Sequence, residues 1–214
     1  MRIAVLGANT TTGQKIVKEA EKAGIKVTSL VSTFNDVVGN GKLIVKSFDE
    51  LVFSDIADCN YIVDTVSFFN ISKYSSELLP VWHLLELLKN SKIKLLELGA
   101  SAFLYTDRKK SKFVFDQDSV IIDDNQSKID RLCVNAFIRL SACTNVEWSC
   151  LCPPLLLDDI IYGCGKFEFS DNILPVGIQG DSSISLNDYV LACIELLKIS
   201  PKKHECISVR TIRD

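Results

Sequence analysis

The chain has few of the features that mark several large classes of protein. Its 214 residues carry a net charge of −3 and no basic block, which argues against nucleic acid as a partner. No apolar run reaches the roughly 20 residues of a membrane span, since the longest, LLPVWHLLELL, is interrupted by His83 and Glu86. The apolar run after Met1 is too short for a signal peptide, so we expect a cytoplasmic protein.

Histidine is scarce, and the cysteines lack the spacing of a familiar metal motif. With only two histidines and no CxxC, the sequence predicts no zinc or other bound metal. The eight cysteines are expected to be the reduced thiols of a cytosolic protein. Cys150 and Cys152 are two apart in an apolar strand pattern, so they should face the same way as small buried side chains.

What the sequence does have is a regular alternation of strand and helix patterns, with 47% apolar residues to fill a core. Strands are predicted near residues 2–7, 26–31, 42–48, 61–68, 93–101, 146–157 and 205–210. Helices are predicted near 11–24, 49–59, 80–91, 125–143 and 186–198. The alternation predicts one α/β domain over 1–214, a Rossmann-like, doubly wound parallel sheet buried on both faces. Within it, residues 153–185, which include the less regular stretch 158–185, are expected to form a small C-terminal substrate lobe on the acceptor side.

The segment GANTTTG, residues 7–13, connects the first strand to the first helix, at the sheet edge where ligands of such folds bind. Gly7 is expected to allow a tight turn and Gly13 to allow close packing of the helix on the strand. The N–H groups at the start of the helix favour an anion. Four polar side chains between the glycines can meet phosphate oxygens: Asn9, Thr10, Thr11 and Thr12.

Two positions bear on whether the loop still binds a dinucleotide, and on which one. Thr10 replaces the middle glycine of a GxxGxxG loop, and a positive φ there would cost about 1–2 kcal/mol. The alternative is an ordinary strand–turn–helix corner in which threonine hydroxyls cap the helix. After the second strand, Ser32 and Thr33 stand where an acidic residue would hold the ribose of NAD, or an arginine the 2′-phosphate of NADP. Because hydroxyls can donate to a phosphate, the sequence favours NADP over NAD.

Several segments occur in the order and spacing of a known family. They are IAVLGANTTTG, VTSLVS, SAFLYTD (101–107), WSCLCPPLLL (148–157), GKFEF (165–169) and SSISLNDYVLACIELL (182–197). Together they resemble, over nearly the whole chain, the atypical short-chain dehydrogenases of the NADH-flavin reductase kind, the group that includes biliverdin reductase B. The resemblance implies a Rossmann-like fold, bound NAD(P)H, and hydride transfer to a flavin such as FMN or a similar flat acceptor.

The resemblance also implies positions for the site. Gly7, Thr10 and Gly13 fall on the phosphate loop, and Ser101 falls beside the nicotinamide as the catalytic candidate. Further cofactor positions are Ser32, Val66, Ser67, Pro153 and Pro154. The chain departs from the family at Thr10, at Ser32 in place of arginine, at Ser47–Phe48 in place of Gly-Asp, and at Ser67 in place of glycine.

No Tyr–Lys pair has the context of classical dehydrogenase chemistry. Tyr105 and Lys109 follow Ser101 too closely, and Tyr162 and Lys166 span two glycines. Ser101 is therefore expected to orient the nicotinamide or the acceptor by a hydrogen bond, or else simply to cap a turn.

For two further pairs of residues, two alternatives stay open. Asp64 and Glu97 interrupt apolar strands, either as proton donors near the pocket or as strand-end carboxylates bonded to loop N–H groups. Phe167 and Phe169 either cover a flat ring or belong to the core.

Two main functions follow. The first is an NAD(P)H-dependent oxidoreductase acting on a small molecule. The second is a non-catalytic NAD(P)-binding or sensing protein of the NmrA-like type, favoured by the altered loop. A third reading is a structural relic that binds only partners. We expect a monomer or homodimer that binds neither nucleic acid nor membrane.

Overall fold

The structure, a computed structural model, describes residues 1–69, 71–75, 77–116, 124–160 and 162–212. Its main element is an eight-stranded sheet in the order β3-β2-β1-β4-β5-β6-β10-β8. The strands are β1 (Arg2–Leu6), β2 (Lys26–Val31), β3 (Lys42–Val45), β4 (Tyr61–Asp64), β5 (Lys94–Leu98), β6 (Trp148–Cys152), β8 (Phe167–Ser170) and β10 (Glu205–Thr211). Neighbouring strands are parallel except β8, which is antiparallel to β10. A separate parallel pair consists of β7 (Leu156–Asp158) and β9 (Ser183–Ser185).

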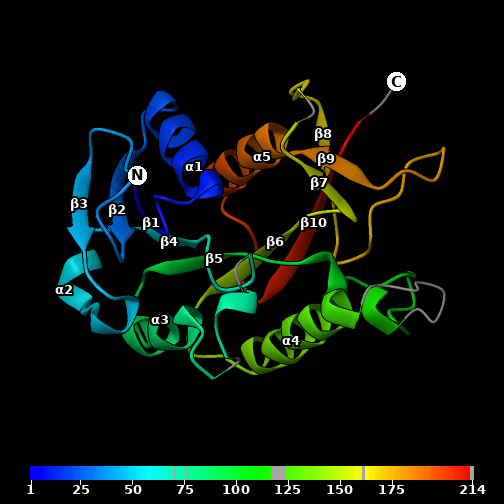
Figure 1. The fold of residues 1–214 in the computed structure, drawn as a ribbon, viewed down its shortest axis with the longest axis horizontal. Coiled ribbons are helices and arrows are strands. Elements are labelled where there is room, and N and C mark those ends of the chain that lie inside the picture. Colours follow the sequence, from blue (N-terminus) through cyan, green and yellow to red (C-terminus); the bar gives the residue numbers. More distant parts are fainter. Residues whose placement is uncertain (70, 76, 117–123, 161, 213–214) are drawn as a thin grey trace.

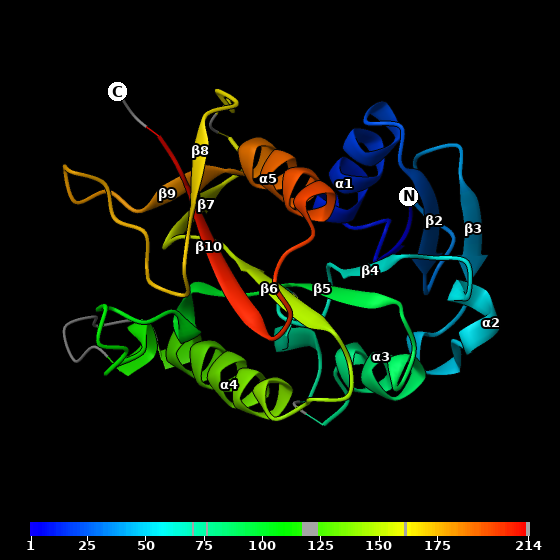
Figure 2. The same ribbon diagram turned by 180° about the vertical axis from the view of Figure 1, so that it is seen from behind.

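Helices cover both faces of the sheet (Figures 1 and 2). Helices α1 (Thr11–Lys22) and α5 (Leu186–Ile199) lie on one face, and α3 (Pro80–Leu88) and α4 (Asp124–Ser141) lie on the other. Each face has its own buried apolar cluster. The prediction of a Rossmann-like, doubly wound sheet is therefore confirmed.

The local signals read from the sequence explain most helix ends. Helix α1 stops before Gly24, whose φ of 73° is left-handed and open to glycine without strain. Pro80 occupies the first turn of α3, where its missing N–H costs nothing. The hydroxyl of Ser185 accepts from the N–H of Asp188 and so caps α5.

Three boundaries differ from the sequence expectation. The predicted strand 146–157 is divided into β6 and β7 because Pro153 and Pro154 cannot donate to a ladder. The predicted helix 49–59 becomes the 3₁₀ turn η1 (Phe48–Glu50) and the short helix α2 (Phe53–Ile56). The stretch 158–185 is more regular than expected, because it supplies β8 and β9.

The two phenylalanines of β8 belong to packing. Phe167 and Phe169 contact each other edge-on, at 5.7 Å between ring centroids, and pack against the core on the α1/α5 face. Of the two readings of this pair, the core reading is the one the structure favours.

Of the helices in the described part of the chain, none combines the length and apolarity that crossing a bilayer requires.

Candidate functional site

The loop GANTTTG lies where the strand order reverses. Strand β1 has β2 on one side and β4 on the other, so its carboxyl end is the switch point at which doubly wound folds bind ligands. Gly7 has a φ of 75°, and a Cβ there would lie 2.4 Å from Cγ2 of Val66. A Cβ on Gly13 would lie 2.1 Å from the carbonyl oxygen of Gly7. Both geometric roles expected of these glycines, the turn and the close packing, are therefore present.

Thr10 is an unstrained helix cap. Its φ of −75° and ψ of 160° are extended, so the cost expected of a positive φ does not arise. Its Oγ1 accepts from the N–H of Gly13 at 3.0 Å and lies 3.2 Å from Oγ1 of Thr65. Thr65 donates its own hydroxyl hydrogen to the carbonyl oxygen of Leu6 at 2.8 Å, so Thr10 is the donor in the contact between the two threonines. The Thr10 hydroxyl is thus engaged twice within the protein.

A cavity of about 420 Å³ lies at the N-terminal end of α1. Its lining residues are Asn9, Thr10, Thr11, Thr12, Thr65, Phe69 and Lys73. No carboxylate is among them, and Lys73, the last residue of the 3₁₀ turn η2 (Ile71–Lys73), brings a positive charge. Within the described residues, the backbone N–H groups of Thr11 and Thr12 have no hydrogen-bond partner. Free N–H groups, a helix dipole and a lysine together suit an anion such as a phosphate.

The loop after β2 is tied to the phosphate loop by an amide. Nδ2 of Asn9 donates to Oδ1 of Asn35 at 3.0 Å, and the hydroxyl of Thr33 donates to the same oxygen at 2.6 Å. Ser32 is exposed, and the Phe34 side chain is 77% exposed. These residues lie where Rossmann folds hold the adenosine half of a dinucleotide.

The residues after β4 divide between the cavity and the interior. Thr65 lines the cavity, whereas Val66 is buried beneath the turn at Gly7. Ser67 is also buried, because its Oγ donates to Oδ2 of Asp64 at 2.5 Å and accepts from the N–H of Val81 at 3.0 Å. The Ser67 side chain therefore points away from the cavity that its neighbour lines.

The predicted nicotinamide side lies further along the same sheet edge. Ser101 opens the 3₁₀ turn η3 (Ser101–Phe103) directly after β5, and Pro153 and Pro154 follow β6. Since β5 and β6 are parallel neighbours, these residues share the edge that carries the phosphate loop, although they are outside the lining of its cavity. Tyr105 and Tyr162 lie outside helices, so neither forms the helical Tyr–Lys pair of classical dehydrogenases.

Asp64 and Glu97 are register partners on β4 and β5, and both are fully buried on the α3/α4 face. Oδ1 of Asp64 accepts from the N–H groups of Val66 at 2.7 Å and Ser67 at 3.1 Å. Asp64 is thus the strand-end carboxylate that holds loop N–H groups. Neither carboxyl oxygen of Glu97 has a hydrogen-bond partner among the described residues.

The two carboxyls have different ionisation behaviour. Burial, reinforced by the charge of Asp64, raises the pKa of Glu97 well above its usual value. Burial also raises the pKa of Asp64, but its bonds to Ser67 and Val66 act in the opposite direction. Burial therefore favours the protonated form more strongly at Glu97 than at Asp64, whose hydrogen bonds favour the carboxylate form. Neither lines the phosphate-loop cavity.

The structure brings four predicted residues into one cavity, namely Asn9, Thr10, Thr11 and Thr12, and adds others that sequence reasoning missed. Those are Thr65, Phe69, Lys73 and, beside them, Asn35. The one available signal was position, since loops after neighbouring parallel strands meet at the same edge. Nothing in the residue types of the segment after β4 marked Lys73 as special.

Comparison with known proteins agrees with this architecture. Protein YwnB of Bacillus subtilis, which is described as uncharacterized, is 26% identical over 219 residues, covering 98% of each chain. A crystal structure from Streptococcus pneumoniae, whose protein is named as a proposed NADH-flavin reductase, superposes with a TM-score of 0.89 at 22% identity, covering 99% of this chain and 100% of that one. A Rossmann-fold NAD(P)-binding family protein from Shigella flexneri superposes with a TM-score of 0.65 at 13% identity, covering 98% and 93%. The sequence matches no model of a known protein family.

The fold is therefore Rossmann-like, as it is in both of these solved structures. At these identities the structural likeness defines the architecture, whereas the chemistry depends on the residues of the site.

Proposed function

We propose that this protein is an NAD(P)H-dependent oxidoreductase that reduces a small, flat acceptor such as a flavin. The observation that carries the proposal is the carboxylate-free cavity at the start of α1, with Lys73 and two unpaired N–H groups. The names of the structural neighbours, an NADH-flavin reductase and an NAD(P)-binding protein, support the same cofactor class.

The residues present fit the phosphate half of such a cofactor. The N–H groups and hydroxyls of Thr11 and Thr12 would hold the pyrophosphate, and Lys73 would offset its charge. Thr10 would act indirectly, because its hydroxyl already holds Gly13 and Thr65. The absence of a glycine at position 10 is therefore compatible with binding.

The adenosine half would lie over the loop after β2. The exposed Phe34 ring would cover the adenine, and the hydroxyl of Ser32 would donate to a 2′-phosphate, which favours NADPH over NADH.

At the other end, bound NAD(P)H supplies the hydride. Ser101, half-buried after β5, would orient the nicotinamide amide or the acceptor, between the buried turn at Pro153 and Pro154 and the phosphate loop.

A second function, binding or sensing of NAD(P) without catalysis, is favoured by one observation. Asp64 and Glu97, the buried carboxyls first considered as proton donors, lie off the cavity. A flavin needs little acid–base help from the protein to accept a hydride, whereas a carbonyl substrate would need a proton donor. If the protein is an enzyme, the lack of a proton donor in the cavity therefore favours a flavin over a carbonyl compound as its acceptor.

The test combines binding and turnover. Thermal-shift titrations with NADH and NADPH should raise the melting temperature, more with NADPH, and NADPH should be oxidised when FMN is added. Lys73→Ala should weaken NADPH binding by roughly tenfold, as expected for loss of one charged contact. Lys26→Ala, at the opposite end of β2, is the matched control and should not. Binding without oxidation would favour the sensing function, and no shift with either nucleotide at millimolar concentration would rule out both.

A further inference from the structure

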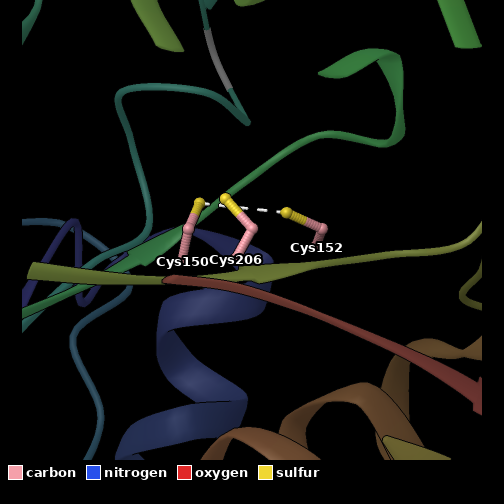
Figure 3. A group of neighbouring side chains, drawn as sticks. All are labelled: Cys150, Cys152 and Cys206. Atoms are coloured by element: carbon pink, nitrogen blue, oxygen red, sulfur yellow. Dashed lines mark hydrogen bonds between the residues drawn. The ribbon is translucent and has the colours of Figure 1, made fainter. Parts of the chain in front are cut away.

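Three thiols converge on the α3/α4 face of the sheet, away from the phosphate loop. Cys150 and Cys152 project from β6, and Cys206 projects from β10, where it is the register partner of Cys150 (Figure 3). The three sulfur atoms all lie within 4.8 Å of one another. In the described part of the chain, no other group of histidine, cysteine and acidic side chains converges in this way.

The spacing of the sulfur atoms suits three ligands of one metal ion. Sγ of Cys150 and Sγ of Cys152 are 3.9 Å apart. Three thiolates at the usual metal–sulfur distance of about 2.3 Å, arranged in a plane around one ion, would be separated by about 4.0 Å. The native strand register therefore places the donors at coordination distance without a change of backbone.

The three donors are also of one chemical kind. All are sulfur atoms of cysteine side chains buried among the apolar residues of the α3/α4 face. Sulfur ligands select soft metal ions over hard ones.

A cavity adjoins the group on the side of β10. A cavity of about 360 Å³ is lined in part by Cys206, together with Lys110, Trp148 and His204. On the opposite side, a Cβ on Gly99 would lie 2.5 Å from Sγ of Cys150, so the sulfur atoms occupy the space that the missing side chain leaves.

We propose that Cys150, Cys152 and Cys206 form a binding site for one soft, thiol-seeking metal ion, with Cu(I) as the preferred occupant. Thiolates select soft metals, and Cu(I) accepts three sulfur ligands. Structural zinc takes four ligands, and the converging group offers three.

The test is a titration of the reduced, full-length protein with Cu(I) under anaerobic conditions, in competition with a chromogenic Cu(I) chelator. The wild type should take one Cu(I) per chain from the chelator. Cys206→Ser should lose affinity by more than the roughly 10- to 100-fold that loss of an outer-shell partner costs. The matched control is Cys193→Ala, which removes a buried thiol from α5 on the other face and should retain wild-type affinity.

X-ray absorption on the copper-loaded wild type gives a reading that does not depend on the folding of any variant. The expected spectrum has three sulfur neighbours at about 2.3 Å and no nitrogen or oxygen ligand. The proposal is overturned if the wild type leaves the copper with the chelator, if Cys206→Ser binds as tightly as Cys193→Ala, or if the spectrum shows nitrogen or oxygen ligands.

Discussion

The phosphate-loop cavity and the buried row of Asp64, Glu97, Cys150 and Cys206 are built in opposite ways. The cavity takes most of its polar residues from one consecutive stretch, Asn9 to Thr12. The row takes one residue from each of four neighbouring strands, through the registers Asp64↔Glu97, Glu97↔Cys150 and Cys150↔Cys206. Its members are buried.

The two regions should therefore affect different properties, ligand binding in one and stability in the other. Exposed groups on a loop act on a ligand and cost the fold little, whereas buried polar groups act on stability and ionisation. Substitutions in the row should therefore change the free energy of unfolding, and substitutions in the loop should change nucleotide affinity.

The largest effect is expected from Asp64→Ala. The substitution leaves the N–H groups of Val66 and Ser67 and the Ser67 hydroxyl without their acceptor, and removes the carboxylate facing Glu97. Urea unfolding should show a loss of about 3–5 kcal/mol. Asp64→Asn keeps one acceptor oxygen and should lose clearly less; equal losses would mean that these bonds contribute little.

Gly13→Ala should affect both properties. Its Cβ would overlap the carbonyl oxygen of Gly7, so α1 must shift away from the turn, at a cost of about 1–3 kcal/mol. Nucleotide affinity should fall together with stability, because the free N–H groups move with the helix. A Gly13→Ala protein with wild-type NADPH affinity would contradict the assignment of this loop to the cofactor.

The raised pKa of Glu97 should make the free energy of unfolding depend on pH. Its pKa in the folded protein is raised above the usual 4.5, so the native state keeps a proton that the unfolded chain releases. The stability contribution of this carboxyl is intact below the usual pKa of 4.5. It is lost as pH rises from there toward the raised pKa of the folded protein, by about 1.4 kcal/mol per pH unit.

Glutamine at position 97 cannot ionise. As pH rises from about 5 to about 7, the Glu97→Gln protein should therefore gain stability relative to the wild type, by up to about 1.4 kcal/mol per pH unit. Chemical denaturation at both values measures the difference. Parallel pH profiles for the two proteins would show that Glu97 is not protonated in the fold.

The smallest effect is expected from Thr10→Ala. Loss of the N-cap hydroxyl should cost about 1 kcal/mol of stability. NADPH affinity should change little, because the hydroxyl is engaged within the protein. Thr11→Ala and Thr12→Ala remove other residues of the cavity lining and should weaken binding more. The reverse ranking, measured by titration, would make Thr10 a direct ligand.

The sequence predicts the two regions to different extents, because one consists mainly of consecutive residues and the other of residues far apart in the chain. The sheet and the position of GANTTTG between β1 and α1 were predictable, because periodicity and the strand–turn–helix context are local. Lys73 was not, since only the spatial arrangement of strands brings the segment after β4 beside α1. The thiol group was half predictable: the spacing of Cys150 and Cys152 puts them on one face, but Cys206 joins them only through pairing with β10.

The segment 158–185 illustrates a second limit. Its residues gave no strong periodicity, yet they form β8 and β9, because pairing with β10 and β7 supplies what the local pattern lacks. The polar row, likewise, could be seen in part as two acidic residues in apolar strands, but not as a row.

The buried acid on β5 also identifies the two sides of a strand that is otherwise ambiguous. β5 reads KLLEL, with leucines on both faces, so burial of apolar side chains alone would accept either orientation. A slip of one residue would turn Glu97 toward the apolar α1/α5 layer, away from Asp64, and leave a lone carboxyl there. Burial of Glu97 therefore specifies the register of β5, because it destabilises a shifted pairing more than it destabilises the native one.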